Sequence, residues 1–353
     1  MRQLNQEVNQ RKRTSSRKKK RSRKKRRAKL ILTFEILLIL VLIAGGVYYY
    51  NFSKLQNYDL DKGNIAVNDF KDENMKDYYT FVLYGVDSQT NQLAKGNRSD
   101  SIIIASINKK TKKVKLLSVY RDTYSSVEGH GFTKINHAYS YGGPELSLST
   151  INRNFDLNAQ QFVTVNFKSL ANVVDLLGGI ELDIQKEEMS NLNAYIGNMN
   201  KINGGNSPKI KNPGKQTLDG NQAVAYARIR YTAGGDLRRA ERQRIVVGQI
   251  LAKAKKSNPV TISKIIDEMF PQILTSFSSK EVLFLAKDLL SYEIEDSQGF
   301  PFDNKGAKIK GVYYGLPVTL ESNVIKMHKY LYGTENYTPS DTVKEISKSV
   351  SGS

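Results

Sequence analysis

The sequence predicts an α/β protein with a central β-sheet flanked by helices. Three runs rich in Val, Ile and Leu lie between residues 79 and 120, and each has the length of a strand. Strands that are apolar on both faces indicate a sheet covered on both sides. Segments with the 3.6-residue spacing of amphipathic helices follow these runs. The chain of 353 residues can bury a substantial core in one large domain, or two at most.

The first 50 residues predict a basic cytoplasmic tail and one transmembrane helix. Residues 1–29 hold fifteen Lys and Arg against a single acid and lack apolar periodicity, which favours a disordered tail. Residues 30–50 are apolar over about the length needed to cross a bilayer. The basic flank places the N-terminal side in the cytoplasm. We therefore expect a single-pass type II protein of the cell membrane, with its body outside the cell.

The net charge of +20 is concentrated in this tail, because residues 51–353 carry only about +7 of it. A nucleic-acid-binding arm is the competing interpretation of the tail. The basic run lacks helical patterning and adjoins the apolar segment, so we expect no nucleic-acid partner. Cysteine is absent, which excludes disulfides and thiolate metal sites. The three histidines argue against a multi-histidine metal site.

Charged residues recur at the ends of the predicted strands. Residues 51–77 are interpreted as a polar extracellular stalk, and the strands that follow span Tyr79–Val86, Ser101–Ile107 and Val114–Tyr120. The adjoining charged residues are Asp87, Arg98, Asp100 and Arg121. Ligands of α/β sheets usually bind at strand ends. These four residues are therefore candidates for one site.

Helices and strands are predicted to alternate beyond residue 120. The predicted elements are a helix at 145–154, a strand at 161–166, a helix at 169–177, a strand at 180–184, a surface excursion at 186–216, a helical segment at 221–227 that starts from Leu218-Asp219-Gly220, helices at 246–256, 262–270 and 279–292, a hairpin-like region at 308–320 and a helix at 323–331. We expect a catalytic domain over 78–255, an extension packed on it over 256–333, and a disordered tail over 334–353.

One stretch, Tyr226–Arg244, concentrates six arginines around a Gly-Gly break. If Ala227–Tyr231 is extended, Arg228 and Arg230 point to the same face. Asp236 then caps or opens a helix that runs through Ile245 and carries further polar side chains, namely Arg239, Arg242 and Gln243. Planar guanidinium groups beside a helix N-terminus suit phosphate or pyrophosphate. A solvated basic helix is the alternative that this stretch leaves open.

Several separated motifs occur in a fixed order along the chain. They are LYGVD at 83–87, RSD at 98–100, SVYRDT at 118–123, KINHAYSYGG at 134–143, VDLLGGIEL at 174–182, LDG at 218–220, and YARIR followed by D, R and RQ at 226–243. Over about residues 79–255 the sequence resembles the LytR-CpsA-Psr family of Gram-positive cell-envelope proteins. One departure is Tyr120, where the family usually has proline. The resemblance implies an α-β-α fold with a mixed central sheet.

The resemblance also implies a phosphotransferase. Such proteins move a glycopolymer, such as teichoic acid or capsular polysaccharide, from a polyprenyl-pyrophosphate carrier to a peptidoglycan hydroxyl. Asp87 and Asp100 would hold Mg²⁺, with Mn²⁺ as the alternative ion. Arg121, Asp87 and Asp236 would be catalytic. The residues expected to bind the pyrophosphate are Arg98, Arg121, Arg228, Arg230, Arg239 and Gln243.

Elementary chemistry agrees with this expectation, because phosphoryl transfer mainly needs positioning and charge neutralisation. Two other functions stay open. A polyprenyl-pyrophosphate pyrophosphatase would use water as the acceptor, and a non-enzymatic envelope regulator would bind an anionic polymer through its arginines. Asp236 could act as a general base or as a helix cap bonded to arginine, and the sequence does not separate these roles.

Overall fold

In the computed structural model, residues 53–88 and 92–351 are described, and the chain from Leu55 onward forms one compact unit. The predicted tail at 1–29 and the predicted transmembrane helix at 30–50 lie outside the described residues. Among the helices of the described ranges, none combines the length and the apolar character that crossing a bilayer needs.

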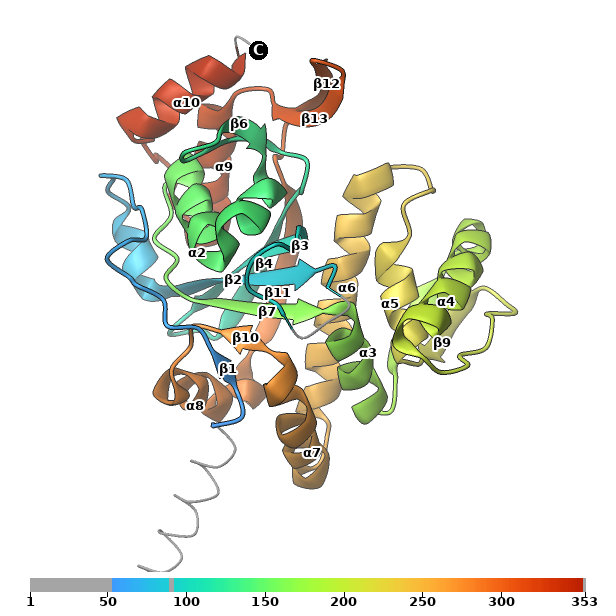
Figure 1. The fold of residues 1–353 in the computed structure, drawn as a ribbon. Coiled ribbons are helices and arrows are strands. Elements are labelled where there is room, and N and C mark those ends of the chain that lie inside the picture. Colours follow the sequence, from blue (N-terminus) through green and yellow to red (C-terminus); the bar gives the residue numbers. More distant parts are fainter. Residues whose placement is uncertain (1–52, 89–91, 352–353) are drawn as a thin grey trace, which may run out of the picture. The chain divides into compact units, whose positions relative to one another are not determined.

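A seven-stranded mixed sheet lies at the centre of the fold, in the order β1-β10-β7-β2-β3-β4-β11 (Figure 1). Its strands are β1 (Gln56–Asn57), β2 (Tyr78–Val86), β3 (Ser99–Asn108), β4 (Lys113–Val119), β7 (Phe162–Asn166), β10 (Leu274–Thr275) and β11 (Glu293–Phe300). Strand β3 pairs antiparallel with both of its neighbours, whereas β2 and β7 are parallel. The prediction of a mixed sheet flanked by helices is confirmed.

Helices cover both faces of the sheet because its strands alternate between two apolar cores. Val82, Tyr84 and Val86 pack on one face against helices α2 (Ile135–Phe155), α9 (Leu320–Tyr332) and α10 (Asp341–Ser351). Phe81 and Leu83, at the intervening positions, pack on the other face with residues from α6 (Gly235–Lys255) and α8 (Ser279–Lys287). This is the period-2 alternation of a strand buried on both faces.

A third core lies beside the sheet, within a helical group (Figure 1). Its elements are α3 (Phe167–Leu176), β8 (Ile180–Ile184), α4 (Met189–Asn203), β9 (Gly214–Leu218) and α5 (Gly220–Arg228), with α7 (Pro259–Met269) packed on α3. The predicted surface excursion at 186–216 is thus wrong over α4. Leu192, Ile196 and Met199 are buried there at the spacing of one helix face.

Two hairpins complete the fold, β5–β6 (Tyr124–Val127 and Gly131–Lys134) and β12–β13 (Asn304–Ile309 and Val312–Pro317). The second confirms the hairpin-like region predicted at 308–320 in its location. The single helix α6 replaces the separate helices expected before and after Ile245.

The structure does not divide the chain where the sequence analysis did. Strands β10 and β11 belong to the central sheet, so residue 255 is not a structural boundary. Residues 334–353 were expected to be disordered, yet α10 buries Val343, Ile346 and Val350 in the core. The expected stalk likewise contributes Leu60 and Met75 to that core. Helix α10 is amphipathic, and both segments pack on apolar side chains of the sheet and α2.

Asp156, at the C-terminal end of α2, forms hydrogen bonds with both the segment before β2 and the segment before α10. Its backbone is left-handed, with φ of 52°, and its side chain is fully buried. The carboxylate accepts hydrogen bonds from Asn68 at 2.7 Å, from Tyr337 at 2.8 Å, and from the Ser340 amide and hydroxyl at 2.8 and 2.6 Å. One side chain therefore joins the N-terminal segment to the chain that leads into α10.

We expect Asp156→Ala to lower the free energy of unfolding by more than about 3 kcal/mol, because several buried donors lose their acceptor. Urea denaturation of the protein measures this loss. Asp156→Asn keeps a residue that tolerates the left-handed backbone and should lose less. The exposed Asp183 on β8 is the matched control, and Asp183→Ala should change stability by no more than about 0.5 kcal/mol. Equal effects of Asp156→Ala and Asp183→Ala would contradict the role given to Asp156.

Candidate active site

The strand ends that carry the predicted charged residues meet at one edge of the sheet. β2 pairs antiparallel with β3, and Val86 lies opposite Ser99, so Asp87 and Asp100 follow on adjacent strands. β3 in turn pairs antiparallel with β4, and Ile103 lies opposite Ser118. The start of β3 and the end of β4, which leads into Arg121, are therefore neighbours. The sequence prediction that these residues share a site is consistent with this arrangement.

Arg121 contacts three carboxylates at this edge. Its Nη1 donates to Asp100 Oδ1 at 2.6 Å, and its Nε lies 3.7 Å from Asp236 Oδ2 and 3.8 Å from Asp122 Oδ2. Burial by itself lowers the pKa of Arg121, but these carboxylates, Asp100 first among them, outweigh burial and raise it. The guanidinium group is thus a fixed positive charge held by the sheet.

The N-terminal end of α6 brings a second set of charges to the same place. Asp236, in the first turn, accepts from Arg230 Nε at 2.9 Å and lies 3.5 Å from Arg239 Nη2. Arg239 is only 7% exposed, and burial lowers its pKa although Asp236 offsets part of that effect. A cavity of about 10 Å³ lies between the sheet and α6, and its lining includes Asp100, Arg121, Asp236, Arg239 and Gln243. Five of the predicted site residues therefore line one space.

Arg228 reaches the site from a helix rather than from the predicted strand. Helix α5 runs to Arg228, so the extended segment expected over Ala227–Tyr231 is wrong. Asp219 and Gln222 form a reciprocal capping box that starts this helix, and alanines favour its continuation. Arg228 lies over the ring of Phe167, 4.2 Å from its centroid, and its Nη1 is 3.8 Å from Asp87 Oδ1. The helical segment predicted at 221–227 from its LDG start is confirmed, and the helix continues through Arg228.

A buried ion pair that the sequence analysis missed holds the segment after α5 in place. Arg242 Nε donates to Glu188 Oε1 at 2.8 Å, and both side chains are 4% exposed. The same guanidinium donates to the Ile229 carbonyl at 3.1 Å and to the Thr232 hydroxyl at 2.9 Å. Arg242 therefore positions the segment that carries Arg230. No local pattern marks Glu188, because it lies more than fifty residues earlier in the chain.

Arg98 and Lys134 lie on the β6–α2 side of the strand ends. Lys134 donates to Asp122 at 2.8 Å, so Asp122 links it to Arg121. Arg98 is exposed. Burial lowers the pKa of His137, and the charges of Arg98 and Lys134 lower it further. The charge of Arg98 therefore influences His137, but Arg98 is not one of the residues that line the small cavity.

Several buried guanidinium N–H groups at the site make no hydrogen bond to the described residues. They are Arg121 Nε, Arg228 Nη1 and Arg239 Nε. Buried donors without a partner are costly, whereas an anion with several oxygens would satisfy them together. The donor set is therefore suited to a phosphate or pyrophosphate group.

The carboxylates fit a hard cation only in part. Asp87 is 54% exposed and loosely paired, whereas the Asp100 carboxylate is engaged by Arg121. Within the described residues, no cluster of three or more His, Cys, Asp and Glu side chains could by itself hold a metal ion. Mg²⁺, however, commonly uses one or two carboxylates together with substrate phosphates. Asp87 and Asp100, on adjacent strand ends, are two carboxylates of the kind that Mg²⁺ uses in this way.

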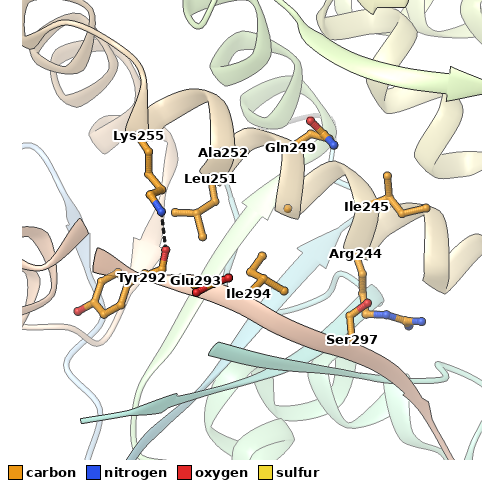
Figure 2. A pocket seen from close by; sticks show the side chains of 11 residues that line it. Arg244, Ile245, Gln249, Leu251, Ala252, Lys255, Tyr292, Glu293, Ile294 and Ser297 are labelled. Atoms are coloured by element: carbon orange, nitrogen blue, oxygen red, sulfur yellow. Dashed lines mark hydrogen bonds between the residues drawn. The ribbon is translucent and has the colours of Figure 1, made fainter. Parts of the chain in front are cut away.

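A larger groove of about 410 Å³ lies between α6 and β11 (Figure 2). Arg244 and Ser297 lie near one end, and Lys255, which donates to the Tyr292 carbonyl at 2.8 Å, lies at the other. Apolar side chains, including Leu251 and Ile294, lie between them. Arg244 is 7% exposed, and its Nε and Nη1 have no hydrogen-bond partner in the described part of the chain. Arg244, which lines this groove, directly follows Gln243, which lines the small cavity.

Comparison with known proteins identifies relatives with a stated activity. The chain is 30% identical to the polyisoprenyl-teichoic acid–peptidoglycan teichoic acid transferase TagT of Bacillus subtilis over 282 residues, which are 77% of this chain and 84% of TagT. It is 31% identical to the transferase TagU of Enterococcus faecalis over 221 residues, 62% of this chain and 68% of TagU.

Solved structures show the same fold. A structure of TagT bound to LIIa-WTA matches with a TM-score of 0.61 and 26% identity, covering 79% of this chain and all of that one. A TagT structure with bound octaprenyl pyrophosphate lipid matches with a TM-score of 0.57 and 25% identity, again over 79% of this chain and all of the other. The sequence profile of the LytR_cpsA_psr family matches residues 46–329. The chain therefore belongs to the LytR-CpsA-Psr family.

Proposed function

We propose that this chain is a membrane-anchored transferase that moves a glycopolymer from a polyprenyl-pyrophosphate carrier to a hydroxyl group of peptidoglycan, outside the cell. The observation that carries the proposal is the convergence of Arg121, Arg230 and Arg239 on one carboxylate, Asp236, beside buried N–H groups without partners. The names of the TagT and TagU relatives, and the pyrophosphate lipid in one TagT structure, support the same chemistry.

The arginines serve the reaction by neutralising charge. In the transfer, the acceptor hydroxyl loses its proton and its oxygen forms a bond to the phosphorus that carries the glycopolymer. The bond from that phosphorus to the bridging oxygen of the pyrophosphate breaks, and polyprenyl phosphate leaves. Negative charge grows on the leaving oxygens, where fixed guanidinium groups stabilise it. We assign this role to Arg121 and Arg239, and a positioning role to Asp236, which orients three guanidinium groups.

Asp87 and Asp100 would hold Mg²⁺ or Mn²⁺ against the pyrophosphate. The ion, when bound, would neutralise phosphate oxygens as a Lewis acid. Asp87 presents a half-exposed carboxylate toward solvent at the end of β2, and Asp100 faces Arg121 from β3. Binding of the substrate phosphate to Arg121 would release the Asp100 carboxylate for this purpose. The two aspartates thus have distinct roles before the substrate enters.

The groove between α6 and β11 offers a place for the apolar chain of the carrier. Its first lining residue on α6, Arg244, follows Gln243 of the small cavity, and the stretch of α6 from Arg244 to Lys255 is about 16 Å long at the rise of an α-helix. Aliphatic side chains, Ile245, Leu251 and Ile294 among them, line it together with polar ones, and the aliphatic part suits an isoprenoid chain. Arg244 at its head is placed to face the carrier's phosphate.

We expect Arg239→Ala to lower the rate of polymer transfer by about 100-fold or more, because one donor to the developing charge is removed. The matched control is the preceding residue of α6, Arg238. Arg238 is 50% exposed and pairs with Glu241 across one turn, so Arg238→Ala should stay within about twofold of the parent protein. The assay follows transfer from a polyprenyl-pyrophosphate-linked sugar to peptidoglycan oligomers. Equal losses in the two variants would argue against the assignment.

The same assay separates the competing functions. Release of polyprenyl phosphate without a glycan product would indicate a pyrophosphatase. Binding of the lipid-linked sugar without turnover under any condition would indicate a non-enzymatic polymer binder. Product that carries a sugar-phosphate link to the glycan supports the transferase.

We expect a chelator to abolish transfer and Mg²⁺ to restore it. Asp87→Asn should raise the Mg²⁺ concentration that gives half the maximal rate by about tenfold or more. Mutating a residue that only supports a metal ligand already weakens metal binding by about 10-fold or more, and loss of the ligand itself should weaken it at least as much. Asp183→Asn, at an exposed position on β8, should leave this concentration unchanged. A rate that is insensitive to the chelator would remove the metal from the proposal.

A further inference from the structure

The outer face of α8 is apolar and basic, with no structural partner among the described residues. Leu283 and Phe284 are 46% and 45% exposed, and Leu290, just beyond the helix, is 72% exposed. Lys280 and Lys287 are exposed on either side of the leucine–phenylalanine pair. The spacing 280, 283, 284, 287 puts all four side chains on one stripe of the helix. We call residues 280, 283, 284, 287 and 290 the α8 stripe.

The charged members of the α8 stripe, Lys280 and Lys287, are both positive. Lys287 Nζ lies 4.4 Å from the centre of the Phe284 ring. The two nearby acids have other partners. Glu281 forms the capping box of α8 with Ser278 and accepts a hydrogen bond from Gln161. Asp288 pairs with Lys112 at 2.7 Å. The stripe therefore combines large apolar side chains with lysines and no free carboxylate, which is the composition of a helix that lies on an anionic lipid surface.

The path of the chain places this stripe close to the predicted membrane span. β1 begins at Gln56 and pairs with β10, with Gln56 opposite Leu274. Helix α8 starts at Ser279, only four residues after β10 ends, and lies near β1 in Figure 1. The predicted span ends at residue 50, and an extended linker from there to Gln56 reaches about 20 Å at most. A helix tethered this closely to the bilayer can reach its surface.

We propose that the α8 stripe docks on the lipid surface next to the anchor and orients the body on the membrane. The inference rests on the membrane anchor of the proposed function. β10 runs antiparallel to β7, so α8 lies toward the sheet edge opposite the charged strand ends. The nine residues of β2 span about 30 Å between these edges. The candidate active site thus faces away from the lipid, toward the wall.

The absence of tryptophan from the sequence gives a direct test. In the full-length chain reconstituted in vesicles of phosphatidylglycerol and phosphatidylcholine, Phe284→Trp introduces a single tryptophan on the stripe, whose emission can be excited apart from that of the tyrosines. We expect brominated acyl chains to quench its emission by about half or more, because an interfacial helix buries its apolar face about 5–10 Å deep. Tyr313→Trp is the matched control, since Tyr313 is 53% exposed on the β12–β13 hairpin, which Figure 1 places far from α8.

A negative charge introduced into the stripe tests the cause of the quenching. With Phe284→Trp as the reporter, Leu290→Glu should weaken the quenching by bromolipid several-fold, whereas Val312→Glu, at an exposed position on the hairpin, should not change it. Both positions are exposed, so neither variant disturbs the core. Replacing phosphatidylglycerol by phosphatidylcholine should also weaken the quenching, because the lysines then lose their counter-charge.

Each outcome decides the proposal. Selective quenching of Phe284→Trp supports it. Equal quenching at the two positions overturns it. Absence of quenching at Phe284→Trp, in a chain that floats with the vesicles, also overturns it but leaves the membrane anchor supported. A chain that does not float with vesicles removes both the anchor and the docking. An emission shift that grows with protein concentration at constant lipid would assign the stripe to a second copy of the chain and overturn the lipid proposal.

Discussion

The structure depends on one electrostatic constraint, which is the burial of several guanidinium groups at a single edge of the sheet. Like charges at this distance repel, and burial removes the water that would screen them. Aspartates beside the guanidinium groups offset this repulsion. Asp100 and Asp236 hold Arg121, and Asp236 also contacts Arg230 and Arg239. Because several N–H groups find no partner among residues 53–88 and 92–351, the balance is incomplete in the way that favours an incoming anion.

Two structural layers must meet for this balance to exist. The sheet supplies Asp100 and Arg121, whereas the helical group beside it supplies Arg228 and the segment leading into α6. The Glu188–Arg242 pair fixes that segment, since a buried ion pair with additional hydrogen bonds has few alternative geometries. An anion bound between the layers would therefore meet positive groups whose positions are already set, and preorganised charge is what phosphoryl transfer requires.

The arrangement also gives the molecule a direction. The charged strand ends lie at one edge of the sheet, and β1, β10 and the start of α8 lie toward the other. Helix α6 runs from the site along the sheet, and the groove on its flank follows the same course. A lipid-linked substrate could thus present its phosphates to the arginines at one end while its apolar chain extends toward the other end of the body.

The sequence by itself determined the mixed α/β core, the strand ends at Asp87, Asp100 and Arg121, and the family, because strand periodicity and short motifs are local properties. Only the tertiary structure decided the rest. Arg228 ends a helix rather than lying in a strand, since the Asp219 capping box outweighs the alternating arginines. Glu188 pairs with Arg242, which positions the segment that carries Arg230. Helix α10 and the segment before β2 contribute to the core. These outcomes depend on which distant apolar and charged groups come together, and such pairing has no signature within a short window of sequence.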